Sequence, residues 1–310
     1  MADISISTAA DLYDALLNIN NHTADNIQLT ADIDMANLPL ENAFTNNNGY
    51  FLSFDGGGYT VSNIKIKNGY SRNFFIKANT IKNVKINGLI DTREGTSTLE
   101  SILYIANPVS AAILIDHVSI KNVEINRSNI ANSVFYYVRN IGSSSNRTFF
   151  VIHSSFSGKI KCTTFYLTLS DAFRASYVDV FYFGEIHASN IMLNEYSQGY
   201  PCAFNNCFFI FSILPNTTIN TSAYYDNDFS HHHNYLYITN LSEVANSTTI
   251  NNIDFNKKNE NFILVDSTEI INTLIDYNES LGANNKLDTT ALILTQDFTF
   301  SFLRERGWAI

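Results

Sequence analysis

The clearest pattern of apolar and polar positions runs from Thr60 to Ile66, where the two kinds of residue alternate with a period of two. This alternation predicts a half-buried β-strand, because successive side chains of a strand point to opposite faces. Three glycines, Gly56 to Gly58, stand just ahead of it. Since glycine adopts positive φ without steric cost, we expect a sharp corner there, with at least one glycine at positive φ.

The end of this strand recurs along the chain as a four-residue motif that closes on a large apolar residue. The copies are Asn63–Ile66, Asn83–Ile86, Asn122–Ile125, Ser157–Ile160, Phe183–Ile186, Ile210–Ile213 and Asn252–Phe255. Their last residues, at positions 66, 86, 125, 160, 186, 213 and 255, are 20, 39, 35, 26, 27 and 42 residues apart. Such spacings are typical of a solenoid of short strands, with one or two turns per step.

This spacing predicts that the isoleucines of the motif stack at equivalent inward positions, with neighbouring turns about 4.8 Å apart. The expected ladder consists of Ile66, Ile86, Ile125, Ile160, Ile186 and Ile213.

The N-terminal segment predicts a short helix followed by a strand pair. Ser7 or Thr8 can cap a helix over residues 7–18, with Asp11 in its first turn. We expect this helix to cover the open strand ends of the first solenoid turn. Residues 26–35 are expected to form the first well-defined strand pair, and their alternating apolar residues are expected to point inward: Ile27, Leu29, Ala31, Ile33 and Met35.

The middle of the chain predicts turns built from a strand, a corner and a second strand. Residues 112–115 precede residues 118–125 in this way, and residues 149–152 precede residues 156–160. From residue 164 onward, apolar residues follow one another directly, so we expect both faces of the strands to carry large side chains and the outer face to be covered.

That outer apolar face is the candidate interface. We expect Phe181, Phe183, Phe209 and Phe211, or their alternating neighbours, to face outward and to be buried against another subunit. A loop of the same chain, residues 222–240, is the competing cover.

Composition narrows the classes of protein that fit. The net charge of −10 and the absence of a Lys/Arg cluster disfavour nucleic acid as a partner. The N-terminus has no secretory signal and no apolar run is long enough to span a membrane, so we expect cytoplasmic synthesis without membrane insertion. We then expect the three cysteines, Cys162, Cys202 and Cys207, to stay reduced and to be buried as small apolar residues.

The opening of the chain resembles the GLUG-type right-handed parallel β-helix proteins. The resemblance rests on residues 6–12, 27–34 and 54–64. The closing residues 287–290, 298–300 and 308–310 are similar to the end of such modules. The Gly-Leu-Phe-Gly element of the family is absent, and residues 72–76 stand in its place. The resemblance implies an all-β fold, a single-stranded right-handed parallel β-helix, of the kind that occurs in phage structural proteins and bacterial adhesins.

No Pro-rich, Gly/Ser-rich or charged linker divides the chain, so we expect a single domain over residues 1–310. Within it, the N-terminal cap spans residues 1–25, the β-helix coils residues 26–285, and a C-terminal strand and cap residues 286–310.

Candidate chemistry is sparse. Polysaccharide-cleaving β-helix enzymes need two carboxylates on neighbouring turns, and Asp179 with Glu185, or Asp171 with Glu195, are the pairs to consider. Solvated carboxylates are the commoner interpretation. The segment His231–His233 could bind a transition metal, but a polar loop over these residues is the favoured interpretation. We therefore assign no catalytic, cofactor-binding or metal-ligating residue, and we expect no cofactor.

Three functions remain open. The leading expectation is a non-enzymatic structural protein of a bacteriophage or phage-like particle: a fibre, decoration or tail-associated subunit located in the virion. Its expected partners are other particle proteins in an oligomeric assembly, and a host-surface glycan is a candidate ligand. The alternatives are a polysaccharide-cleaving tailspike-type enzyme and a bacterial surface adhesin module, the latter disfavoured by the absent signal and by a chain expected to be complete, with caps at both ends.

Overall fold

A computed structural model of the chain describes its backbone over a discontinuous set of residues. They are 2–23, 25–41, 49–70, 72, 74–93, 101–106, 112–126, 132–138, 148–162, 164–166, 169–170, 175–192, 195–196, 203–204, 208–213, 217–220, 234–239, 249–251 and 262–265. Beyond residue 126, side-chain burial is described for a part of these residues only.

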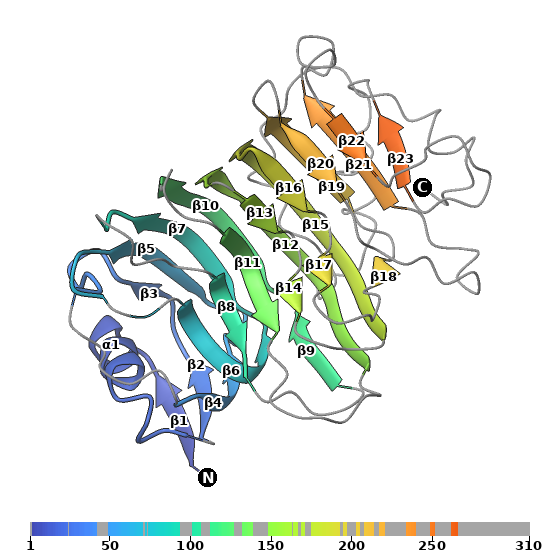
Figure 1. Ribbon diagram of the computed structural model, residues 1–310. Helices are drawn as coiled ribbons and strands as arrows, with labels where there is room; N and C mark the ends of the chain where they lie inside the picture. Colours follow the sequence, from blue (N-terminus) through green and yellow to red (C-terminus); the bar gives the residue numbers. More distant parts are fainter. Residues whose placement is uncertain are drawn as a thin grey trace.

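The described part of the chain is mostly β-strand, with one short helix, α1 (Ala9–Leu17). Strands β1 to β12 are Asp3–Ile6, Asn26–Leu29, Ile33–Asp34, Phe51–Asp55, Thr60–Ile66, Phe74–Lys82, Lys85–Asp91, Ser101–Ile105, Ala112–Asp116, Ser119–Asn126, Asn132–Val138 and Thr148–Lys161. Strands β13 to β23 are Thr164–Tyr166, Leu169–Ser170, Ala175–His187, Asn190–Met192, Glu195–Tyr196, Ala203–Phe204, Phe208–Ile213, Thr218–Asn220, Asn234–Thr239, Thr249–Asn251 and Phe262–Val265. Figure 1 shows the strands laid side by side from the N-terminal helix towards β23, with β5 beside β7, for example.

The helix forms where the sequence predicts it. The Thr8 side chain accepts a hydrogen bond from the Asp11 backbone N–H, and the Asp11 carboxylate accepts one from the Thr8 backbone N–H, which completes a capping box. Leu12, Ala15 and Leu16 are buried against the main core. Thr8 rather than Ser7 is therefore the N-cap.

Strand pairing in the described residues is parallel throughout, and it joins segments far apart in the sequence. Side-chain hydrogen bonds between stacked strands link residues 23 to 37 positions apart. One register ladder places large apolar residues directly over one another, all buried: Ile27, Phe54, Ile81, Ile115 and Val151. The predicted inward pattern of the first strand is also confirmed for Ile27, Leu29, Ile33 and Met35, whereas Ala31 is half-buried at the bend between β2 and β3.

The predicted isoleucine ladder is confirmed in its second half and wrong in its first. Ile125 pairs with Ile160, Ile160 with Ile186 and Ile186 with Ile213. However, Ile66 pairs with Asp91, which in turn pairs with Ile125.

Ile86 lies on a different ladder, between Val61 and Ile120, although it is buried. The motif ending at Ile86 is therefore five residues out of register with the motif ending at Ile66. The last copy of the motif, residues 252–255, lies outside the described residues.

Left-handed backbone conformations explain that error, because they occur in two columns. One column lies at the corner before the strand, where Gly58 (φ 81°), Asn83 (φ 53°) and His117 (φ 51°) follow one another in register. The second lies five residues later, inside the strand, at Asn63 (φ 56°), Gly88 (φ 85°) and Asn122 (φ 54°).

Asparagine and glycine suit both columns, since they tolerate positive φ better than other residues. The same Asn-apolar-polar-Ile motif thus arises at two different places in a turn. The prediction of positive φ in the glycine corner is confirmed at Gly57 and Gly58.

Further along the chain, the corner and the strands on either side of it merge into one long strand, through two shifts of register. Between β10 and β12 the register shifts after Ile120, so that Lys121 and Asn122 together oppose Ser157. Between β12 and β15 it shifts again at His153. Consequently residues 149–152 and 156–160, predicted as two strands around a corner, are parts of one long strand, β12.

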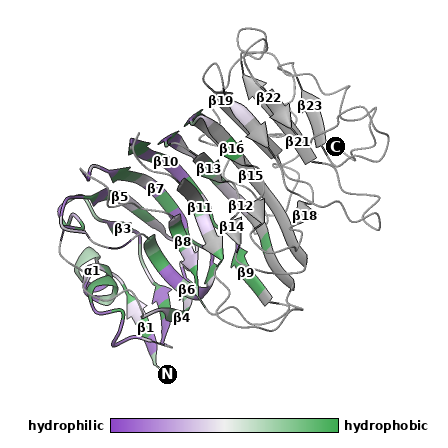
Figure 2. Ribbon diagram, viewed as in Figure 1, coloured by the Kyte–Doolittle hydropathy of each residue, from purple (hydrophilic) through white to green (hydrophobic). Residues whose placement is uncertain are grey.

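Most of the buried apolar residues that the structure describes form one main core cluster, which follows the ladders from α1 to β16. Figure 2 shows hydrophobic residues recurring in α1, β7 and β9. Cys162 is buried, as predicted, and burial raises the pKa of its thiol to about 12, whereas Cys202 and Cys207 lie outside the described residues. No helix of the described residues is long and apolar enough to cross a membrane.

Candidate functional site

The most polar part of the buried interior is a cluster at the end of β7, formed by Tyr70, Arg72, Asp91 and Arg93. Asp91 occupies the ladder position between Ile66 and Ile125, where the neighbouring turns place isoleucine. A carboxylate at a core position is costly unless it is paired, so its partner decides whether the turn can form.

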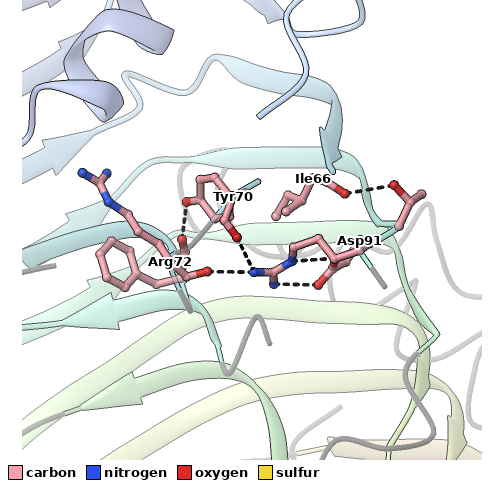
Figure 3. A network of polar contacts seen from close by, with 7 residues as sticks. Ile66, Tyr70, Arg72 and Asp91 are labelled. Atoms are coloured by element: carbon pink, nitrogen blue, oxygen red, sulfur yellow. Dashed lines mark hydrogen bonds and ion pairs between the residues drawn. The ribbon is translucent and has the colours of Figure 1, made fainter. Parts of the chain in front are cut away.

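Arg93 is that partner. Its Nη2 lies 2.8 Å from Asp91 Oδ2 and its Nε lies 3.0 Å from Asp91 Oδ1, which makes a two-pronged ion pair. The Arg93 side chain is 1% exposed and the Asp91 side chain is 0% exposed. Arg93 Nη1 also donates to the carbonyl oxygens of Tyr70 and Arg72, both at 3.0 Å. Figure 3 shows these contacts joining the corner around Tyr70 and Arg72 to Asp91.

Tyr70 and Arg72 extend the cluster towards the N-terminal helix. The Tyr70 hydroxyl donates to the Phe74 carbonyl at 2.5 Å, and burial raises the pKa of Tyr70 above its ordinary value. Arg72 Nη1 donates to the Leu16 carbonyl at 2.5 Å, and burial lowers the pKa of Arg72.

Leu16 lies in the last turn of α1, where carbonyl groups have no partner within the helix and a cation is favourable. Arg72 therefore ties α1 to the corner that precedes β6.

The chemistry open to this cluster is limited by its burial. Both oxygens of Asp91 are engaged by Arg93, and the pair has almost no contact with solvent. A general acid or base must reach a substrate, which this carboxylate does not. The cluster is best understood as a buried polar clamp between two stacked corners and α1.

A second, smaller cluster lies apart from the main core, on β6 and β8. Phe74, Tyr104 and Ala106 are buried in it, with Tyr50 packed against them. Lys77 is 8% exposed, and its Nζ lies 5.4 Å from the Phe74 ring centroid and 5.3 Å from that of Tyr104. These distances are those of cation–π contacts, which stabilise a desolvated ammonium group.

The carboxylates of Asp34 and Asp55 accept hydrogen bonds that hold the chain at its bends. Asp34 accepts hydrogen bonds from the Asn63 side chain at 2.9 Å and from the Ala36 N–H at 3.0 Å, and these two bonds lower its pKa. Burial alone would raise the pKa of Asp55, but hydrogen bonds from Gly57 and Asn83 and the nearby Lys82 lower it.

The described backbone keeps one of the two carboxylate pairs considered for catalysis apart, and the other pair lies partly outside the described residues. Asp179 and Glu185 belong to one strand, β15, and a separation of six residues places their Cα atoms about 20 Å apart. Glycosidases hold their two carboxylates about 5–9.5 Å apart. Glu195 pairs with Leu169 in the backbone, and Asp171 lies outside the described residues.

The His231–His233 segment also lies outside the described residues. In the part of the chain that the structure describes, no group of three or more His, Cys, Asp and Glu side chains is placed to hold a metal ion.

The four phenylalanines of the predicted interface occupy two different kinds of register position. Phe181 and Phe183 pair with Ser155 and Ser157, which alternate with the core residue Phe156. Phe209 pairs with Tyr182, which pairs with Phe156. Phe211 pairs with Gly184, which pairs with Gly158, two positions after Phe156 in β12. The side-chain exposure of these four residues lies outside what the structure describes.

Sequence reasoning missed the clamp, although one signal was visible. In two turns an isoleucine follows a core residue at a distance of five: Ile66 after Val61, and Ile125 after Ile120. At the same distance after Ile86 stands the polar residue Asp91, and Arg93 follows Asp91 two residues later. Only the correct register identifies this Asp as a core position. As to relatives, no protein-family model, no curated protein and no solved structure matches this chain.

Proposed function

We propose that the chain is a single-stranded right-handed parallel β-helix and a non-enzymatic structural protein of a bacteriophage or phage-like particle. The observation that carries the proposal is the continuous parallel register from β1 to β23, in which each strand stacks on a segment one turn away in sequence. Connections between parallel strands of one sheet are right-handed in about 98% of cases, which supports the hand of the helix.

The use of the polar groups favours a scaffold over a catalyst. The buried Asp91 and Arg93 clamp two corners, and Asp34 and Asp55 hold bends in the backbone. The resemblance of the opening residues to the GLUG-type proteins supports a role in a phage particle, since such solenoids occur there. A ladder of parallel strands whose described carboxylates hold bends and corners suits a fibre, decoration or tail-associated subunit.

Mass spectrometry of purified particles tests the assignment. Phage particles from the bacterium that carries the gene would be purified on a density gradient, and the chain quantified along it. We expect it to peak with the infectious or assembled particles, at a fixed ratio to the capsid protein, while a soluble host enzyme serves as the control. Recovery only in the unassembled fractions would overturn the proposal.

A direct assay addresses the enzyme alternative. The purified chain would be incubated with capsular and lipopolysaccharide glycans of the host, and reducing ends would be measured over time. We expect no release above a boiled control, and sustained release would instead establish a tailspike-type hydrolase or lyase.

A further inference from the structure

Three asparagines of the chain are followed directly by glycine: Asn48, Asn68 and Asn87. Such a step is chemically unstable, because glycine has no Cβ to shield its backbone nitrogen and leaves the backbone free to bring that nitrogen to the preceding side chain. Asn48 lies outside the described residues, so the comparison concerns the other two steps. These two lie in different surroundings, one in a surface turn and one inside the sheet.

The step Asn68–Gly69 lies in a turn between β5 and β6. Both residues are exposed, and Gly69 has φ of 98°. The turn is closed by a hydrogen bond from the Tyr70 N–H to the Lys67 carbonyl at 3.2 Å, the long end of the usual range. A surface turn closed in this way opens locally at little cost in free energy, so the Gly69 nitrogen can reach the Asn68 side chain.

The step Asn87–Gly88 lies inside β7, which is paired on both sides. Asn87 is in register with Ser62 of β5 and with Lys121 of β10. Its side-chain oxygen also accepts a hydrogen bond from the Asn122 side chain at 2.7 Å. Moving this side chain onto the Gly88 nitrogen would break that bond and disturb two strand pairings, so the reaction there requires a larger opening of the sheet.

We propose that Asn68–Gly69 is a spontaneous modification site, at which Asn68 deamidates to a mixture of aspartate and isoaspartate. The Gly69 nitrogen attacks Cγ of Asn68 and loses its proton, the Cγ–Nδ2 bond breaks, and ammonia leaves with that proton, which closes a succinimide ring. Water then opens the ring at Cγ, which gives aspartate, or at the main-chain carbonyl carbon of residue 68, which gives isoaspartate. Water is the co-reactant, and the reaction does not depend on the proposed function.

The isoaspartate product would act on the buried polar clamp, because Tyr70 follows the modified step directly. Isoaspartate adds one carbon atom to the main chain between Lys67 and Tyr70, and the Tyr70 carbonyl accepts the hydrogen bond from Arg93 at 3.0 Å. The main chain has little room for that atom, because a Cβ added to Gly69 would collide with the Glu41 carbonyl oxygen. We therefore expect the conversion to move Tyr70 away from Arg93 and to lower the melting temperature of the chain.

The two steps can be compared within the same molecule. The purified full-length chain would be incubated at mildly alkaline pH, and trypsin would then release Asn68 in the peptide 68–72 and Asn87 in the peptide 86–93. Mass spectrometry follows the gain of about 1 Da per deamidation, and an isoaspartyl methyltransferase identifies isoaspartate. We expect Asn68 to react at least about ten-fold faster than Asn87 in the folded chain, and the two to react at similar rates in urea.

Three variants connect the reaction to the clamp. N68Q keeps an amide but closes the larger ring far more slowly, N68D supplies the charge without the extra main-chain atom, and N87Q is the matched control. The melting temperature of each would be measured before and after incubation. We expect it to fall on incubation in the wild type and in N87Q and to stay constant in N68Q, and we expect freshly purified N68D to melt like the fresh wild type.

The comparison of rates needs no variant, so it decides the proposal even if N68Q fails to fold. Equal rates at Asn68 and Asn87 in the folded chain would overturn the proposal. An incubated wild type that contains isoaspartate at position 68 and melts like incubated N68Q would overturn the link to the clamp.

Discussion

The turns built on β5, β7 and β10 and those built on β12 and β15 solve the same stacking problem in two ways. In the first region, left-handed residues such as Asn63 and Gly88 divide each turn into short segments. In the second, β12 and β15 run on for 14 and 13 residues, and Gly158 stacks on Gly184. The comparison teaches that bends are optional in this ladder. What every turn retains is the alternation of core and outer positions.

The first region also contains a cost, the Asp91–Arg93 pair inside an isoleucine ladder, whereas the described core positions of the same ladder in β12 and β15 are Ile160 and Ile186. Replacing Arg93 with Met leaves a buried carboxylate without its partner, and we expect a loss of about 3–5 kcal/mol of unfolding free energy. Urea denaturation followed by circular dichroism measures it.

The double variant D91L/R93M is the control, because it restores an apolar ladder position next to Ile66 and Ile125. It is expected to recover much of the loss, short of the two hydrogen bonds that Arg93 donates to the carbonyls of Tyr70 and Arg72. A single variant as stable as the wild type would show that the pair does not hold this turn.

The isoleucine ladder runs through both regions, so one alanine variant in each region compares how much the core contributes to stability there. Ile125 and Ile160 are 2% and 1% exposed and pair directly. Each change to alanine is expected to cost about 2–5 kcal/mol, because each leaves a cavity in the same core. Denaturant unfolding of I125A and I160A, done side by side, checks this. A near-zero cost for I160A alone would mean that the core ends at β10.

The left-handed corners can be tested at a position where only the backbone matters. Gly58 has φ of 81°, and no atom lies within 4 Å of an added Cβ. We expect Gly58→Val to cost about 1–3 kcal/mol through backbone strain. Gly57→Val should cost at least as much, because its Cβ would also approach the Leu29 carbonyl oxygen at 2.8 Å.

Gly58→Asn is the control for strain, since Asn83 occupies the equivalent position of the next turn at φ of 53°. It should leave the melting temperature nearly unchanged. If valine is accepted at both glycines as readily as asparagine is at Gly58, the corner does not constrain the fold.

The smallest expected effect is a pH dependence confined to the bends of the first region. Because the folded state lowers the pKa of Asp34 and Asp55, their contribution to stability is present above the unfolded value of about 3.9 and is lost as pH falls through the lower folded values. Thermal unfolding of wild type and D34N between pH 2 and 7 should show a difference that shrinks below about pH 4. A difference that is independent of pH would argue against this role.

Some features of the fold were predictable because they depend on neighbouring residues alone. The capping box of Thr8 and Asp11 lies within a single turn, and the positive φ of Gly57 follows from the steric freedom of glycine. The strand alternation from Thr60 to Ile66 was likewise local. The polar clamp was not predictable, because Arg93 and the Tyr70 carbonyl meet only after two turns have stacked.

The sequence by itself determined that the chain is built of stacked short strands, where its first helix begins and which residues alternate into the core. The tertiary structure decided which residue lies over which. Asparagine tolerates positive φ equally well at the corner, as in Asn83, and within the strand, as in Asn63, so the same motif fits both sites. The choice depends on hydrogen bonds to the adjacent turn, and a local sequence pattern contains no information about that neighbour.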